Sequence, residues 1–263
     1  MTRRALVVLG AVLLLLPRVS GAQGDGALPP SVPPLTDEDR RAAFPDVTMH
    51  DMSGRNWHSL VVADHLEWQR LDGASLASWD ARGWVGGDRT RLWFRANGEA
   101  GDGHLRDAGG QALMGRMVSR WWDVVGGVRQ DVRPGDPQTW AAIGIQGLAP
   151  YWFDVEATAY VGASGRTQFR AVADYDLLVT NRLILQPAVT VEANGKADAA
   201  RATGAGLSRT EMGLRWRYEV RREFAPYLGV VWSRQWFGSA DLARQAGERV
   251  GGARLVAGVR VWH

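Results

Sequence analysis

Apolar and polar residues alternate along one segment of the sequence after another, and positions 153 to 161 show the pattern most clearly. The odd-numbered residues there are all apolar, and the even-numbered ones are Asp154, Glu156, Thr158 and Tyr160. Successive side chains of a β-strand point to opposite faces, so this period of two predicts a strand with one apolar and one polar face. A Leu-Ala-Pro-Tyr sequence at 148–151 joins it to a similar segment that begins at Thr139. The pair predicts an antiparallel hairpin.

The same alternation recurs and predicts twelve strands between Trp57 and the last residue. In the first strand we expect an apolar face with Leu60, Val62, Leu66 and Trp68, and a polar face with His65, Glu67 and Gln69. Short turns are expected at 87–89, 119–121, 148–151, 178–182 and 221–225. Connections that are mostly longer and rich in glycine are expected at 70–75, 97–110, 131–138, 162–166, 194–206 and 236–252.

Short turns at one end and longer loops at the other are typical of outer-membrane β-barrels. Strands of about ten residues cross a membrane when they tilt, and closure of the barrel leaves no sheet edge exposed to lipid. The sequence therefore predicts an all-β fold, a transmembrane antiparallel β-barrel of about twelve strands over residues 57–263. A soluble double-sheet sandwich, which alternates in the same way, is the alternative.

Charges on the polar faces favour the barrel, because an unpaired ion in a packed core costs several kcal/mol whereas a wet lumen keeps it hydrated. The inward carboxylates would either line a cation path or pair with inward arginines and block the lumen, and we favour pairing. The carboxylates are Asp80, Asp123, Asp131, Asp154, Glu156, Asp174, Glu192, Glu211 and Glu219, and the arginines are Arg82, Arg129, Arg170, Arg215 and Arg217. Tryptophans near strand ends fit an aromatic girdle; they are Trp57, Trp122, Trp152 and Trp262.

The first residues predict a signal peptide at 1–22, with Arg3 and Arg4 before an apolar run at 5–16 and a small-residue cleavage site at 20–22. A proline-rich segment at 23–56 then predicts a flexible, disordered arm. The signal peptide removes three of the 31 basic residues and none of the 28 acidic ones. The remaining 28 of each balance, so we expect no nucleic-acid partner.

Four long runs resemble the copper resistance protein B family of Gram-negative outer membranes. They are WDARGWVGGDRTRLWFRANGE, GVRQDVRPGDPQTWAAIGIQGLAPYWFDVEATAYVGASGRT, LLVTNRLILQP and YEVRREFAPYLGV. The resemblance implies a barrel in the outer-membrane lipid, an arm in the periplasm and a role in copper tolerance, and a periplasmic multicopper oxidase or copper chaperone as partner. No serine lies near an inward histidine with a third orienting residue, so no catalytic residues are expected. A general small-solute porin is the alternative function.

The candidate copper ligands follow from the softness of Cu(I), which favours thioether and imidazole groups. The chain has no cysteine, so methionine and histidine are the candidates. The tightest cluster is Met49, His50 and Met52, and His58 follows six residues later. We expect Cu(I) rather than Cu(II) at this cluster, although two methionines can also occur in a linker by chance.

Two further candidates are expected inside the barrel. His65 falls on the polar face beside Glu67, where a hydrogen bond in the lumen is the alternative to copper binding. Met114 and Met117 are three residues apart and therefore point to opposite faces of a strand. Met114 shares its face with Arg116, which predicts that Met114 points into the lumen, as a copper ligand or as a residue that fills a gap.

Overall fold

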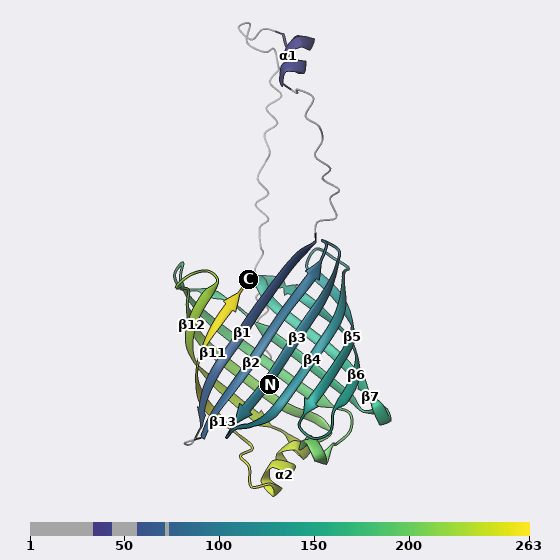
Figure 1. Ribbon diagram of the computed structural model, residues 1–263, viewed down its shortest axis with the longest axis vertical. Helices are drawn as coiled ribbons and strands as arrows, with labels where there is room; N and C mark the ends of the chain where they lie inside the picture. The colour runs from purple at the N-terminus through teal and green to yellow at the C-terminus, as the bar shows by residue number, and fades with distance from the viewer. Residues whose placement is uncertain (1–33, 44–56, 72–73) are drawn as a thin grey trace, which may run out of the picture. The chain divides into compact units, whose positions relative to one another are not determined.

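A computed structural model gives the structure of residues 34–43, 57–71 and 74–263. The chain divides into two units, residues 1–54 and 55–263. The second unit is a barrel of tilted antiparallel strands (Figure 1). The strands are β1 (His58–Leu71), β2 (Ala74–Gly86), β3 (Thr90–Gly101), β4 (His104–Met117), β5 (Trp122–Arg133), β6 (Gln138–Ala149), β7 (Phe153–Gly162), β8 (Thr167–Asp174), β9 (Leu177–Leu178), β10 (Leu183–Asn194), β11 (Gly206–Tyr218), β12 (Phe224–Gln235) and β13 (Gly251–Trp262).

The ring closes because the first and last strands pair, with Val62 opposite Trp262. The remaining strands of the ring pair in chain order, except that β8 pairs with β10. β8 pairs with residues 188–194 of β10, and the short β9 pairs with residues 184 and 185 of the same strand. β9 therefore lies in line with β8 and does not count as a further strand of the ring. The prediction of a twelve-stranded antiparallel barrel is confirmed. Among the residues described, no helix is long and apolar enough to cross a membrane.

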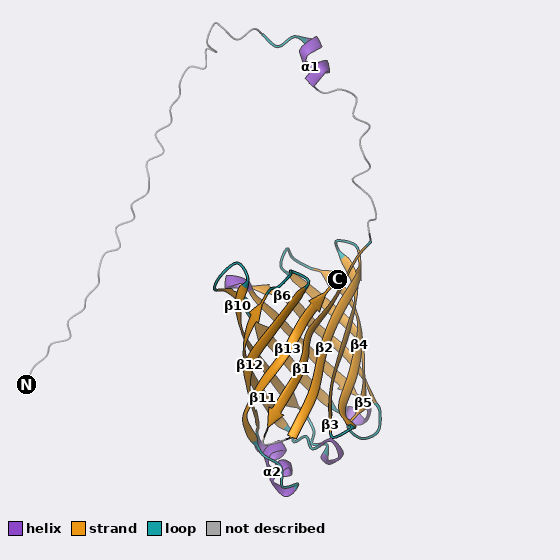
Figure 2. Cartoon of the chain, turned by 60° about the vertical axis from the view of Figure 1, so that its left-hand side comes forward, coloured by secondary structure: helices purple, strands orange, loops and turns teal. Residues whose placement is uncertain are grey.

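The two ends of the barrel differ in their connections (Figure 2). The end that holds the start of β1 and the end of β13, here called the terminus end, has only short turns, at 87–89, 118–121, 150–152, 179–182 and 219–223. The opposite end, called the loop end, has two long connections, at 195–205 and 236–250. The second of these contains the helix α2 (Phe237–Gln245). The two long loops fall at the end where longer connections are expected, but the connections at 102–103, 134–137 and 163–166 are as short as the turns of the terminus end.

One predicted loop is wrong. Residues 97–110 were expected to be a connection because they are rich in glycine, but β3 and β4 extend through them to a two-residue turn at Asp102 and Gly103. Both residues have positive φ, 54° and 78°. An Asp-Gly pair adopts these angles readily and matches the twist of the flanking strands, so it makes a tight hairpin.

The first unit contains one described element, the helix α1 (Asp37–Ala43). Regular structure was not expected anywhere in the arm, and this expectation is wrong for these residues. Thr36 and Asp39 cap the helix reciprocally: Asp39 N donates to Thr36 Oγ1 at 3.1 Å, and Thr36 N donates to Asp39 Oδ2 at 2.9 Å. These bonds satisfy backbone groups that a helix start otherwise leaves free.

Inner and outer faces alternate along the strands as predicted. On β7, for example, Thr158 and Tyr160 are 3% and 1% exposed, whereas Phe153 and Val161 are exposed. The outer face is apolar, as lipid requires. The inner face also holds an apolar cluster on one wall, consisting of Leu113, Val125, Trp140, Ala142 and Tyr160 with Trp93 packed against it.

A β-bulge changes the faces of β1. Ala63 lies opposite Ala81 and His65 lies opposite Asp80, so Asp64 is an extra residue on β1. Before the bulge Val62 is buried and Val61 exposed; after it Leu66 and Trp68 are exposed. The prediction that Val62 shares the outer face with Leu66 is therefore wrong, because the extra residue shifts the alternation by one position.

Candidate functional site

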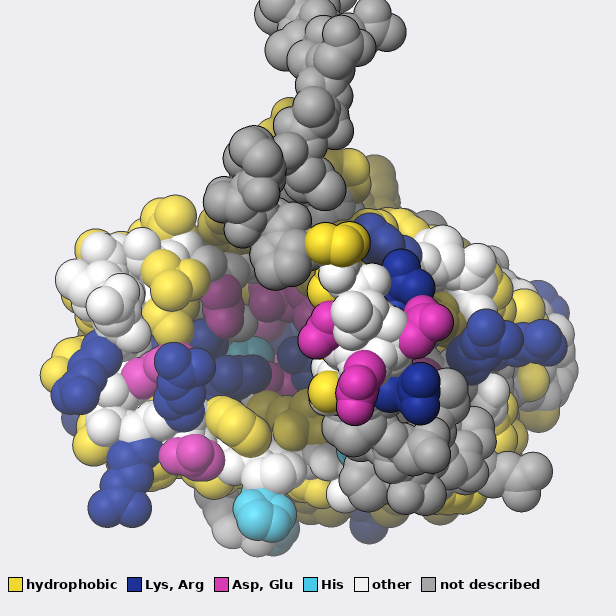
Figure 3. Space-filling model, turned by 90° about the horizontal axis from the view of Figure 1, so that it is seen from above, with side chains coloured by type: hydrophobic (Ala, Val, Ile, Leu, Met, Phe, Trp, Pro, Cys, Tyr) yellow, Lys and Arg dark blue, Asp and Glu magenta, His cyan; other side chains and the backbone are white. Residues whose placement is uncertain are grey.

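The lumen is the candidate site, because charged side chains of both signs face it from strands around the ring. Figure 3 looks into the terminus end and shows Lys and Arg beside Asp and Glu within the hollow. The expected pairing of inward carboxylates with arginines is confirmed for Asp131, Asp154, Glu156, Glu192 and Glu211. Two of these pairs lie within one strand, one joins adjacent strands, and two cross the lumen.

The most extensive crossing is made by Arg82 of β2. Its Nε atom lies 2.8 Å from Oδ2 of Asp64 on β1, and its Nη1 atom lies 3.4 Å from Oε1 of Glu156 and 3.7 Å from Oδ2 of Asp154. The last two residues belong to β7. Four strands lie between β2 and β7 along one side of the ring, and six strands lie between them along the other. Arg82 therefore links nearly opposite walls.

Arg95 of β3 reinforces this crossing. Its Nη1 atom lies 3.0 Å from Oε2 of Glu156, and its Nη2 atom donates to Gln146 of β6. On the other side, Arg260 of β13 lies 3.1 Å from the Oδ1 atom of Asp64. Asp64 and Glu156 thus each bind two guanidinium groups, which makes a continuous chain of charges across the centre of the lumen.

A second network is centred on Glu67 of β1, which is 5% exposed. Its Oε1 atom lies 2.6 Å from Nε of Arg215 and accepts a hydrogen bond of 3.1 Å from Tyr227 Oη. Gln69 Nε2 donates to the other carboxylate oxygen at 3.1 Å. The rings of His65 and Tyr227 pack almost perpendicular to each other, with centroids 6.0 Å apart. These contacts hold one wall of the lumen together from β11 to β1.

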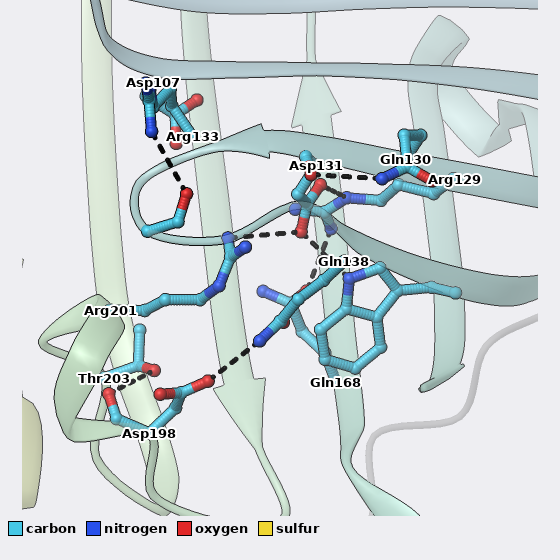
Figure 4. Close-up of polar contacts among 12 residues, drawn as sticks. Asp107, Arg129, Gln130, Asp131, Arg133, Gln138, Gln168, Asp198, Arg201 and Thr203 are labelled. Carbon is cyan, nitrogen blue, oxygen red and sulfur yellow. Dashed lines mark hydrogen bonds and ion pairs between the residues drawn. The ribbon is translucent and has the colours of Figure 1, made fainter. Parts of the chain in front are cut away.

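At the loop end, Asp131 of β5 is the centre of a third network (Figure 4). Arg129 Nε lies 2.6 Å from Oδ1 of Asp131, and Trp140 Nε1 donates to Oδ2 at 2.9 Å. Arg201, from the connection between β10 and β11, reaches the same Oδ2 atom at 3.9 Å. Arg129 also donates to Gln168 of β8 at 2.8 Å. The loop is thereby joined to residues inside the barrel.

Further bonds fix this connection across the loop end. Asp198 accepts a hydrogen bond of 3.2 Å from Gln138 and lies 3.3 Å from Arg166 Nη1. Gly204 N donates to Ser239 Oγ of α2 at 2.8 Å. Because residues 198 and 201–203 also line an internal cavity, the connection 195–205 narrows the loop end of the lumen.

The free space in the lumen is divided into small cavities. The central one, lined by Arg82, Arg95 and Glu156, has a volume of about 170 Å³. Two others, which share Asn97 and Arg170 with it, have volumes of about 300 and 330 Å³. Arg82 therefore crosses the lumen at the level of the central cavity.

The predicted copper ligands lie in different places. Met49, His50 and Met52 fall outside the described residues. His58 is the first residue of β1 and is exposed at the terminus end. His65 lines the central cavity, as predicted. Within the described parts of the chain, no three His, Cys, Asp or Glu residues are arranged to hold a metal ion.

The prediction that Met114 points into the lumen is wrong. Leu113 is fully buried on the inner face, and Met114 is 54% exposed on the outer face. Arg116, which led to that prediction, is exposed near the end of β4, where a long cationic side chain reaches the membrane surface from the outer face. Met212 is also exposed, and Met117, on the same face as Leu113, is exposed at the end of β4. None of these three methionines lines the cavities of the lumen.

Sequence reasoning missed several lumen residues. Asp64 was not expected to face inward, because the bulge has no clear signature in the sequence. Asp198 and Arg201 lie in a loop and have no periodicity. The apolar inner cluster had a signal, since Leu92, Trp93 and Phe94 form an uninterrupted apolar run on a strand whose two faces should differ.

Comparisons with a protein family and with two individual proteins agree with each other. Residues 57–263 match the family described as "Copper resistance protein B precursor". The chain is 50% identical over 231 residues to the "Copper resistance protein B homolog" of Pseudomonas syringae pv. tomato, covering 88% of this chain and 79% of that protein. It is 46% identical over 231 residues to "Copper resistance protein B" of Escherichia coli, covering 88% of this chain and 78% of that protein.

Solved structures show the fold alone. The NanC porin matches with a TM-score of 0.52 at 11% identity, covering 78% of this chain and 99% of the porin. The similarity extends over almost the whole of that barrel.

Proposed function

Because the chain belongs to the copper resistance protein B family, we propose that it confers copper resistance from the outer membrane by binding copper ions and either sequestering them or moving them across that membrane. The observation that carries this proposal is the family match over 57–263, which covers the complete barrel. The apolar outer face supports an orientation across the outer-membrane lipid. In this proposal the terminus end, with the N-terminal arm, faces the periplasm.

Copper capture is assigned to the arm. Met49, His50 and Met52 supply two thioethers and one imidazole within four positions, and His58 is exposed where β1 begins. Thioether ligands favour Cu(I) over Cu(II). None of Met114, Met117 and Met212 lines the cavities of the lumen, which supports the arm as the source of sulfur ligands.

The arm would exchange copper with a soluble protein in the periplasm, of which a multicopper oxidase or a copper chaperone is the kind we propose. A ligand set of two thioethers and one imidazole leaves a coordination position for a ligand from such a partner. We propose no catalytic role for the barrel itself. Turnover of an ester substrate by the refolded barrel would contradict this part of the proposal.

The decisive experiment measures the copper content of the refolded mature protein by elemental analysis, after loading with Cu(I) under a reductant or with Cu(II). The test variant replaces Met49, His50 and Met52 with alanine. The matched control replaces Met114, Met117 and His104, which are also two methionines and one histidine and are exposed on the barrel. We expect the test variant to lose bound Cu(I) and the control to retain it.

Other outcomes have definite meanings. If both variants retain copper, the ligands are in the lumen and the arm is not the capture site. If the unaltered protein binds no copper and deletion of the gene leaves copper tolerance unchanged, the proposal is wrong. Conductance for small solutes that is independent of copper would support the general porin instead.

A further inference from the structure

We propose that Arg82 is the residue that closes the lumen and sets its charge selectivity. This inference goes beyond the proposed function, because it concerns the passage of ions through the barrel and requires no copper. It rests on the position of one side chain, which crosses the lumen between nearly opposite walls.

The orientation of Arg82 begins with the bulge in β1. A bulge adds a residue to one strand and redirects side chains, and here the added residue is Asp64. Its carboxylate is 14% exposed and lies between Arg82 at 2.8 Å and Arg260 at 3.1 Å. Asp64 therefore holds the Nε side of the Arg82 guanidinium at the wall, which leaves the Nη1 atom directed toward β7.

The far side of the guanidinium meets Glu156 and Asp154. Guanidinium is planar and presents several donors at once, so a single arginine can bind carboxylates on two walls together. Lysine has the same charge but a single ammonium group, and could not contact both walls in this way. The crossing thus depends on the shape of arginine as well as on its charge.

The charges around the central cavity determine which ions an open lumen would admit. Asp64, Asp80, Glu156, Asp174 and Glu211 line the central cavity, and so do the four arginines Arg82, Arg95, Arg170 and Arg215. Five carboxylates thus face four guanidinium groups. Without Arg82 the ratio becomes five to three. Rings of carboxylates select cations, so a lumen opened by loss of Arg82 should prefer cations.

The test measures ion conductance of the refolded full-length mature protein in planar lipid bilayers, in a KCl gradient without copper. Arg82→Gln should raise the conductance about threefold or more. It should also move the reversal potential toward the equilibrium potential of K⁺. The control is Arg244→Gln, which removes the same charge from an exposed pair on α2, where Arg244 Nη1 lies 2.6 Å from Asp241 Oδ1. The control should conduct as the unaltered protein does.

A second variant keeps the inference testable if Arg82→Gln does not fold. Glu156→Gln removes the nearer carboxylate partner on β7 and leaves the Arg82 charge in the lumen. The reversal potential should therefore move toward the equilibrium potential of Cl⁻. Arg82→Lys should conduct more than the unaltered protein without gaining the cation preference of Arg82→Gln. Folding of each variant is checked by its heat-dependent electrophoretic mobility. If folded variants at Arg82 and Glu156 conduct as the unaltered protein does, the inference is wrong.

Discussion

The Nε atom of Arg215 lies 2.6 Å from Oε1 of Glu67, although the two residues are 148 positions apart in the chain. Both side chains are almost completely buried, with 8% and 2% of their surface exposed. The pair connects β11 to β1 across two intervening strands, β12 and β13. It therefore holds together the part of the wall that contains the closing strand pair.

Glu67→Gln is expected to destabilise the barrel. The substitution leaves a hydrogen-bond acceptor for Tyr227 but removes the counter-charge of buried Arg215, and loss of one partner of a buried ion pair costs about 3 kcal/mol. Unfolding in urea, followed by tryptophan fluorescence in lipid vesicles, measures the change. The control is Asp241→Asn, which breaks the exposed pair between Asp241 and Arg244 on α2. Such a pair contributes at most about 1 kcal/mol, so an equal loss in both variants would contradict the prediction.

Gly258→Ala should also destabilise this wall. A Cβ atom at Gly258 would lie 2.6 Å from Tyr227 Oη and 2.6 Å from the carbonyl oxygen of Leu66, closer than real Cβ contacts. Overpacking of this kind costs about 1–3 kcal/mol. Gly252→Ala, on the same strand, meets nothing within 4 Å and is the control. The prediction is wrong if the two variants have the same urea midpoint.

Ser239→Ala should loosen the connection between β10 and β11. Ser239 is 3% exposed, and its Oγ atom accepts the hydrogen bond of Gly204 N. Loss of one net hydrogen bond of about 1 kcal/mol would increase local opening about fivefold. Limited trypsin digestion of the refolded barrel, with cleavage after Lys196 or Arg201, provides the measurement. Ser59→Ala, at an exposed position in β1, should be cut at the unaltered rate.

His65→Gln should leave the bound Cu(I) of the refolded protein unchanged. His65 packs against Tyr227, and the described residues bring no sulfur ligand to it. Elemental analysis beside the arm variant of Met49, His50 and Met52 tests this expectation. A marked loss of Cu(I) from folded His65→Gln protein would instead identify a copper site in the lumen.

The fold could be predicted from the sequence wherever the period of two is uninterrupted. On β7, Asp154 and Glu156 carry charges between apolar neighbours, and the inner and outer faces follow directly. The strand number, the closed ring and the short turns were predicted for the same reason. The lipid outside and the water inside impose the alternation on every strand.

The prediction failed where local chemistry breaks this rule. The extra residue Asp64 reverses the faces of β1, and no residue type marks a bulge of this kind. The sequence places Met114 on the wrong face because Met114 shares its face with Arg116, although a cation near a strand end can also reach the membrane surface. The partners of Arg82 could not be inferred, because contacts across the lumen depend on how strands far apart in the chain are arranged around the ring.

The pairing of β1 with β13 also determines how this ring can form. The other pairings join strands that are consecutive or nearly so in the chain, but Val62 and Trp262 are separated by almost the whole barrel. Bringing together strands so far apart in the chain costs more chain entropy than forming a hairpin does. We therefore expect the pairing of β1 with β13 to form last. Until then the nascent sheet has two free edges, which hydrocarbon does not tolerate. Assembly is therefore expected to be all-or-none, with the edges shielded by a catalyst of insertion until β1 and β13 pair.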